Sequence, residues 1–150
     1  MPPRPIDHPT VQIFEEIRRI DRGVRAAVAK HLPPGVSFAQ YEVLSHLDRR
    51  GDGLTPAEIA RAVQAPKSGL TNTLQRLEDA GLVRVEPCGE DGRRKRVWLT
   101  DAGREVHSAT VAGTRPRMEH LREAFTIDEF RAALPFLKAL RAWFDEKGWD

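Results

Sequence analysis

Two short helical patterns meet at one proline and are followed at once by a change of periodicity, and no other feature constrains the fold as strongly. Residues 55–58 read Thr-Pro-Ala-Glu, which places a hydroxyl at the N-cap, a proline at the first helical position and a glutamate at the third. Pro66 interrupts the helix that starts there, and a second helical pattern runs from it to Gly81, a natural C-terminal stop. Two helices this close around a proline predict a helix-turn-helix.

The period becomes two directly after Gly81. Residues 82–85 and 95–99 alternate in hydrophobicity and predict two short strands, with Gly89 and Gly92 in the turn between them. A hairpin that follows the second helix of a helix-turn-helix is a wing. The chain has 150 residues, of which 40% are hydrophobic and 31% charged, so we expect one globular domain with a core of its own.

Helical patterns also flank this head on both sides. Apolar residues recur at helical spacing over 10–30, a further helix opens at Ser37, and a long helix starts after the wing at Thr100. Thr126 begins a second capping box, and Pro135 inside the last pattern predicts either a kink or a later helix start. The expected fold class is mainly α with a small β-wing: a flexible arm at 1–10, then a single domain at 11–150 with a winged helix-turn-helix head at 36–100 and flanking helices at 11–32 and 101–147.

The polar side of the second helix of the pair carries side chains that can read bases in a major groove. Leu70, Leu74 and Leu77 mark its buried side, so the polar residues point the other way. Asn and Gln amides pair with adenine, arginine with guanine, and a Thr methyl group contacts thymine, while a lysine at the helix start reaches a phosphate. A plain solvated face is the alternative, and the wing that follows favours DNA contact. The residues expected to contact DNA from this helix are Lys67, Ser68, Thr71, Asn72, Gln75 and Arg76.

The wing has a cluster of basic residues at its turn. Arg93 is expected to enter a minor groove, and Arg94, Lys95 and Arg96 to lie along phosphates. Asp91 would repel DNA, but two residues before Arg93 it can accept a hydrogen bond from that guanidinium and orient it. The alternative is a basic edge that only keeps the hairpin soluble. The net charge is only +2, so the positive field is local.

The stretch from Leu54 to Glu105 resembles the winged helix-turn-helix of the MarR family of regulators. The matching wing signature is Asp91, Arg93 and the closing Leu99-Thr100. The resemblance implies a homodimer whose outer helices interlock around a twofold axis, with two heads on a pseudopalindromic double-stranded DNA operator. The apolar stripes over 13–28 and 130–144 exceed what one small head needs to cover, although packing within a single chain would also bury them.

The function implied is a cytoplasmic, sequence-specific transcriptional regulator, most simply a repressor released by a small aromatic or anionic effector. The family resemblance makes Phe38, Tyr41 and His46 candidates for the effector pocket, with ordinary core packing as the alternative. No enzyme, cofactor or metal site is expected, because the histidines lack metal-ligand spacing and His107 and His120 look like two exposed sites. The rival functions are a winged-helix protein-interaction module without DNA binding, which predicts a neutral wing, and an enzyme hidden in the crevice, which needs convergent titratable groups.

The single cysteine and the N-terminal residues carry less information. Cys88 excludes an internal disulfide, so a reducing cytoplasm is expected, and no leader or membrane-spanning segment is apparent. Three residues depart from the pattern of the family. Cys88 stands where the family often has an acidic residue, and Glu90 adds a negative charge where a basic or neutral residue is common. Pro66 stands where the family often has an Asp or Ser that caps the recognition helix. A redox role for Cys88 at the root of a basic hairpin is the less favoured interpretation.

Overall fold

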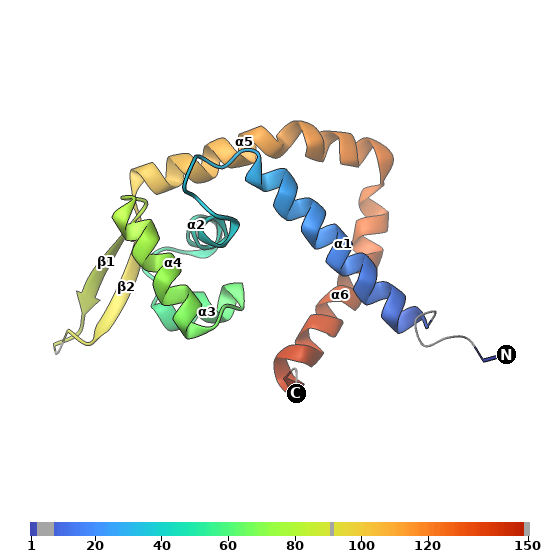
Figure 1. Ribbon diagram of the computed structural model, residues 1–150, viewed down its shortest axis with the longest axis horizontal. Coiled ribbons are helices and arrows are strands. Elements are labelled where there is room, and N and C mark those ends of the chain that lie inside the picture. Colours follow the sequence, from blue (N-terminus) through green and yellow to red (C-terminus); the bar gives the residue numbers. More distant parts are fainter. Residues whose placement is uncertain (3–7, 91, 149–150) are drawn as a thin grey trace. The chain divides into compact units, whose positions relative to one another are not determined.

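The computed structural model describes residues 1–2, 8–90 and 92–148. Mainly helical structure with one small antiparallel sheet confirms the expected secondary-structure content (Figure 1). The chain divides into two compact units, Met1–Gly113 and Thr114–Asp150. The elements are α1 (Pro9–Ala29), α2 (Phe38–Arg50), α3 (Pro56–Val63), α4 (Lys67–Asp79), β1 (Val83–Cys88), β2 (Arg94–Leu99), α5 (Asp101–Ala124) and α6 (Ile127–Lys147).

Local capping determines where α2 and α3 start. The Ser37 and Thr55 side chains each accept a hydrogen bond from the backbone N–H three residues on. In turn, the Gln40 and Glu58 side chains accept from the backbone N–H groups of Ser37 and Thr55. Each capping box therefore satisfies two N–H groups that a helix start leaves open. Pro66 is the N-cap of α4 and offers no side-chain acceptor, so α4 begins without such a cap.

The end of α4 turns the chain directly into the wing. The Gly81 N–H donates to the Glu78 carbonyl (2.9 Å) and the Leu82 N–H to the Leu77 carbonyl (2.9 Å), which is a Schellman motif. Gly81 has φ +73°, a left-handed conformation that glycine adopts without strain. The predicted C-terminal stop at Gly81 is confirmed.

The core of the head lies where α2, α3 and α4 pack with the root of the hairpin. The expected buried side of α4 is confirmed, because its three leucines are all buried. Burying one leucine or isoleucine side chain contributes about 1.5–3 kcal/mol, so this cluster is the main source of the head's stability. The core consists of Val43, Leu44, Leu47, Ile59, Ala60, Leu70, Leu74, Leu77, Leu82, Val83, Val97 and Leu99.

The hairpin is longer than the sequence pattern predicted. β1 extends to Cys88, three residues past the expected end, and pairs antiparallel with β2 from Val83↔Leu99 to Cys88↔Arg94. Beyond Val85 the apolar alternation stops, and the strand continues because backbone pairing, not a buried face, holds it there. On its outer side β2 also forms a bridge from Val97 to Leu54.

Unit 2 contains the end of α5 and all of α6. The predicted capping box at Thr126 is confirmed, and α6 runs unbroken from Ile127 through Pro135. The alternative of a later start is therefore wrong, and a kink at Pro135 stays a prediction. α6 buries none of its residues among those described, and several of its large apolar side chains are exposed: Ile127, Phe130, Leu134, Phe136, Leu137 and Trp143.

Candidate nucleic-acid interface

The polar face of α4 is open to solvent. All six residues predicted to contact DNA from this helix are exposed, while the leucines behind them are buried. Ser68, Thr71, Asn72 and Gln75 follow one another at spacings of three, one and three, so the helix presents them on one side. The face therefore has the orientation that the sequence pattern predicted.

Two of these side chains already make bonds within α4. The Thr71 hydroxyl donates to the Lys67 carbonyl (2.9 Å), which leaves its methyl group as the part available for an apolar contact. The Gln75 amide donates to the Asp79 carboxylate (2.9 Å), and this bond is exposed to solvent. Glu78 is occupied elsewhere, because its carboxylate accepts from the Val85 N–H at 3.2 Å and so joins α4 to the hairpin.

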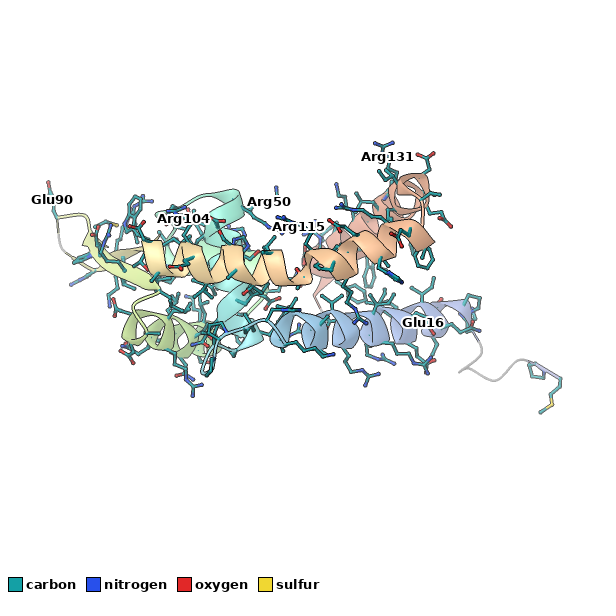
Figure 2. All side chains as sticks on the ribbon, turned by 90° about the horizontal axis from the view of Figure 1, so that it is seen from above. Glu16, Arg50, Glu90, Arg104, Arg115 and Arg131 are labelled. Atoms are coloured by element: carbon teal, nitrogen blue, oxygen red, sulfur yellow. The ribbon has the colours of Figure 1, made fainter. Side chains whose placement is uncertain are left out.

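The hairpin alternates its basic residues between two faces. The register pairs Cys88 with Arg94 and Glu86 with Arg96, so these four side chains share one face, whereas Lys95 lies on the other. Arg93, Arg94, Lys95 and Arg96 are all exposed, and Glu90 lies at the hairpin tip (Figure 2). Asp91, predicted to orient Arg93, lies outside the described residues.

Arg96 is held by the loop before α3. Its guanidinium donates to the Gly53 carbonyl at 2.7 Å, a contact between residues 43 positions apart. Gly53 has φ +71°, and a Cβ there would lie 2.6 Å from the Trp98 ring, so only glycine fits. The sequence pattern predicted only a phosphate contact for Arg96 and did not indicate its hydrogen bond to the Gly53 carbonyl.

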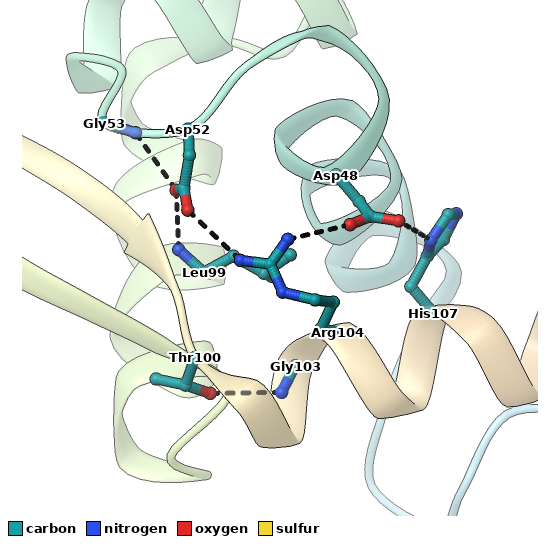
Figure 3. A network of polar contacts seen from close by, with 8 residues as sticks. All are labelled: Asp48, Asp52, Gly53, Leu99, Thr100, Gly103, Arg104 and His107. Carbon is teal, nitrogen blue, oxygen red and sulfur yellow. Dashed lines mark hydrogen bonds and ion pairs between the residues drawn. The ribbon is translucent and has the colours of Figure 1, made fainter.

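A polar network joins the same loop to α2 and α5 (Figure 3). Asp52 accepts from the Leu99 N–H at 2.7 Å, and Arg104 reaches both Asp48 (3.2 Å) and Asp52 (3.6 Å). Asp48 also bonds the His107 Nδ1 atom at 2.7 Å. Sequence reasoning missed this network, because its members are far apart in the chain and match no motif.

The expectation that His107 is an exposed site is wrong. Its side chain is buried, with 4% of the residue exposed, and its Nε2 atom has no hydrogen-bond partner among the described residues. The burial follows from the packing of α5 against α2, which a helical pattern alone does not reveal. His120 is exposed, as expected.

The candidate effector residues lie on α2. Phe38 and Tyr41 are half-buried with ring centroids 6.0 Å apart, and the Tyr41 ring lies 5.8 Å from the His107 ring. The Arg25 guanidinium lies 4.6 Å from the centre of the Phe38 ring. His46 is half-buried as well.

Charge and burial compete beside that aromatic group. Burial raises the pKa of Glu42 above its ordinary value, and the Arg25 guanidinium acts in the opposite direction. Arg25 donates to Asp21 at 2.8 Å, and this bond raises the pKa of its guanidinium.

A separate cleft of about 450 Å³ lies between the α1–α2 connection and the start of α5. None of the three predicted effector residues borders it. Its lining combines apolar side chains with two opposite charges: Lys30, His31, Leu32, Pro33, Leu82, Ala102, Glu105, Val106 and Ala109.

Neither a cluster of metal ligands nor a membrane-spanning helix occurs among the described residues. Over residues 1–2, 8–90 and 92–148, no three His, Cys, Asp or Glu side chains gather as metal ligands would. In the same parts of the chain, none of the helices has the length and apolar character needed to span a bilayer.

Comparison with known proteins identifies relatives of the head. Residues 35–94 match the model of the MarR family. The transcriptional regulator HosA of Escherichia coli is 33% identical over 98 residues, which are 65% of this chain and 71% of HosA. The HTH-type transcriptional regulator PecS of Dickeya dadantii is 35% identical over 86 residues, 56% of this chain and only half the length of PecS.

Solved structures share the fold. A MarR family transcriptional regulator from Silicibacter pomeroyi superposes with a TM-score of 0.72 at 27% identity, covering 94% of this chain and 93% of that one. Bordetella bronchiseptica BpsR, whose DNA binding is regulated by 6-hydroxynicotinic acid, gives a TM-score of 0.73 at 21% identity, over 87% of this chain and 98% of BpsR. The winged helix-turn-helix architecture is confirmed.

Proposed function

Because the chain belongs to the MarR family of transcriptional regulators, we propose that it is a homodimeric repressor that binds a pseudopalindromic operator and leaves it when a small effector binds. The observation that carries this proposal is the pairing of two exposed surfaces on one head. The face of α4 from Lys67 to Arg76 has no acidic residue, and the neighbouring hairpin presents four consecutive basic residues. A protein-interaction module has no need for both. We assign the chain no catalytic activity, since its relatives are transcription regulators.

Base reading falls to α4 in this proposal. Asn72 and Gln75 pair with adenines, Arg76 pairs with a guanine, and the Thr71 methyl group, with its hydroxyl turned to the helix backbone, contacts a thymine. Ser68 bonds a base edge at the helix start. Each well-made bidentate pair discriminates by about 1–3 kcal/mol against the wrong base.

Backbone contacts come from the start of α4 and from the wing. Lys67 and the uncapped N–H groups of the first turn of α4 face a phosphate. Arg93 enters the minor groove, oriented by Asp91, while Arg94 and Lys95 neutralise phosphates from opposite faces of the hairpin. Arg96 contributes its charge from its position against the Gly53 carbonyl.

Dimerisation is supported by apolar surface that the single chain leaves uncovered. α1 exposes Val11, Ile13, Ile20 and Val24, and α6 exposes apolar side chains along its whole length. Isolated exposed apolar residues are common, but rows of them on two helices mark an interface. We propose that α1, α5 and α6 of two copies pack together around a twofold axis.

An aromatic acid is the effector class that the structure favours. Phe38, Tyr41 and His107 offer ring faces, and Arg25 beside Phe38 offers a cation for a carboxylate. BpsR, which shares the fold, is regulated by such an acid. His46 remains a weaker candidate, since the ring contacts that support this proposal join Phe38, Tyr41 and His107.

The test is fluorescence anisotropy with the duplex upstream of the chain's own gene, a scrambled duplex and a salt series. Sequence-dependent binding with a steep loss of affinity at high salt supports the proposal. Arg93→Ala should weaken binding to both duplexes and reduce the preference for A·T-rich flanks. Arg131→Ala removes the same charge from α6 and serves as the control, because its exposed pair with Asp128 contributes little.

Two results would contradict the proposal. Equal affinity of the Arg93→Ala variant and the parent at every salt concentration would exclude the minor-groove role. Absence of binding to a random-sequence duplex pool even at low salt would favour the protein-interaction module instead.

A further inference from the structure

The root of the wing is fastened to the loop that precedes α3. The Val97 N–H donates to the Leu54 carbonyl (2.8 Å) and the Gly53 N–H to the Val97 carbonyl (3.0 Å). Two residues further along β2, on the edge that faces away from β1, the Leu99 N–H donates to the Asp52 carboxylate (2.7 Å). The direction in which the hairpin leaves the head therefore depends on where this loop lies.

Asp52 is the member of that loop whose position depends on charge. The Asp52 Oδ1 atom accepts from the Leu99 N–H and from the Gly53 N–H, while the Asp52 Oδ2 atom lies 3.6 Å from Arg104 Nη2. The side chain is 28% exposed, so water screens it only in part. Without Arg104, two backbone N–H groups alone would hold this partly exposed carboxylate in place.

Arg104 is shaped to hold two carboxylates at once. Its Nη1 atom lies 3.2 Å from Asp48 on α2, and its Nη2 atom points to Asp52 (Figure 3). A planar guanidinium can bond two acceptors in fixed directions, which a lysine ammonium on a flexible stem does less well. Arg104 thus ties the end of α2 and the loop to the first turns of α5.

The Asp48 end of the bridge is anchored in the protein interior. A carboxylate only accepts hydrogen bonds, so the His107 Nδ1 atom donates the 2.7 Å bond to Asp48. His107 is buried and has no other polar partner in the described residues, so moving Asp48 would leave its N–H without an acceptor. The His107 bond therefore holds Asp48 in place, Asp48 positions the Arg104 guanidinium, and Arg104 in turn positions Asp52.

We propose that Arg104 and Asp52 are positioning residues for the wing, which determine DNA affinity without contacting DNA. They hold the loop that carries Gly53, whose carbonyl binds Arg96 and whose Cα lies under Trp98. The orientation of Arg93 to Arg96 relative to α4 follows from this anchor. The effect on affinity rests on the proposed DNA binding, whereas the anchoring itself is a property of the free protein.

Amide hydrogen exchange on the full chain tests the anchoring without DNA. Arg104→Met keeps the aliphatic stem and removes the charge, so the Leu99 amide should exchange about tenfold faster or more. The Leu74 and Leu77 amides in α4 should keep their rates, which shows that the head remains folded. Arg115→Met, the same change further along α5, is the matched control and should alter none of them. Unchanged exchange at Leu99 in the Arg104→Met variant would overturn the proposal.

Anisotropy with a duplex that the parent selects from a random-sequence pool tests the effect on DNA. Arg104→Met and Asp52→Asn should each weaken binding about tenfold at unchanged salt slope, and the double variant should bind no worse than the weaker single one. Lys95→Ala, by contrast, should lower the slope by about 0.9, as the loss of a phosphate contact does. A similar fall in slope for Arg104→Met would make Arg104 a phosphate contact and overturn the proposal.

The two experiments separate this proposal from the DNA-binding proposal. A parent protein that selects no duplex contradicts DNA binding and the effect on affinity, and the exchange rates then decide the anchoring on their own. A parent that binds its duplex while both variants bind equally well supports DNA binding and overturns the positioning role. Additive losses in the double variant would likewise show that Arg104 and Asp52 act separately.

Discussion

Gly103 lies in the first turn of α5, directly against the start of β1, and alanine at this position should destabilise the head strongly. A Cβ there would lie 2.1 Å from the Leu82 carbonyl oxygen and 2.9 Å from the Leu99 side chain. Carbon and oxygen atoms that are not bonded normally stay about 3.3 Å or more apart. The backbones of α5 and β1 would therefore have to separate by about 1 Å, which neighbouring rotamers cannot absorb.

The cost follows from what this separation breaks. Thr100 ties the two elements by donating its N–H to the Leu82 carbonyl (3.2 Å) and its hydroxyl to the Gly81 carbonyl (2.7 Å). Each lost bond costs about 1 kcal/mol, and overpacking costs about 1–3 kcal/mol more. The higher helix propensity of alanine stabilises α5 by about 1 kcal/mol and offsets part of this loss. The net loss is about 3 kcal/mol, which lowers Tm by roughly 6–12 °C in a chain of this size.

Thermal unfolding followed by circular dichroism at a fixed protein concentration measures the effect. Gly69→Ala in α4 is the matched control, because its Cβ would meet only the Pro66 ring at an ordinary 3.4 Å. That variant should be stabilised by up to about 1 kcal/mol. If Gly103→Ala unfolded within about 2 °C of the parent, a shift too small for a loss of 3 kcal/mol, the close approach of α5 to β1 would be refuted.

Three further perturbations have outcomes of known sign. Glu42→Gln should raise Tm near pH 7 and should have no effect below about pH 4. Burial raises the pKa of the Glu42 carboxyl, so the folded protein loses stability as the pH rises and this carboxyl ionises. A Tm unchanged near neutral pH would contradict this. Glu58→Gln should lower Tm near pH 7. The Thr55 backbone N–H lowers the pKa of Glu58, so the ionised carboxylate stabilises the fold above its ordinary pKa and this stabilisation is lost in acid. Equal pH–stability curves for variant and parent would refute this. Leu44→Ala should cost about 2–5 kcal/mol in urea unfolding because Leu44 is fully buried, and a loss under 1 kcal/mol would mean that the core refills the cavity.

The sequence patterns that succeeded are local ones. The capping boxes at Thr55 and Thr126, the stop at Gly81 and the leucine face of α4 each depend on residues within one or two helical turns. Such signals act on the backbone directly, so they are legible without knowing what packs against them. They were enough to indicate a winged helix-turn-helix and the solvent-facing side of α4.

The errors and omissions arose where contact depends on packing between distant segments. The burial of His107 requires α2 beside α5, and the brace from Arg96 to Gly53 joins residues 43 positions apart. Asp52 and Arg104 carry no motif, because two carboxylates and a guanidinium are common surface residues until the fold brings them within bonding distance.

The sequence by itself thus determined the order of helices and strands, the ends of most helices and which face of α4 meets water, because capping, periodicity and turn chemistry work over a few residues. The tertiary structure alone decided how the wing is held. Its root is anchored by Asp52 and Arg104, with Asp48 and the buried His107 behind them. These bonds exist only after the hydrophobic core has brought α2, β2 and α5 together, since the entropy cost of closing such long loops is met by burial and not by the polar groups themselves.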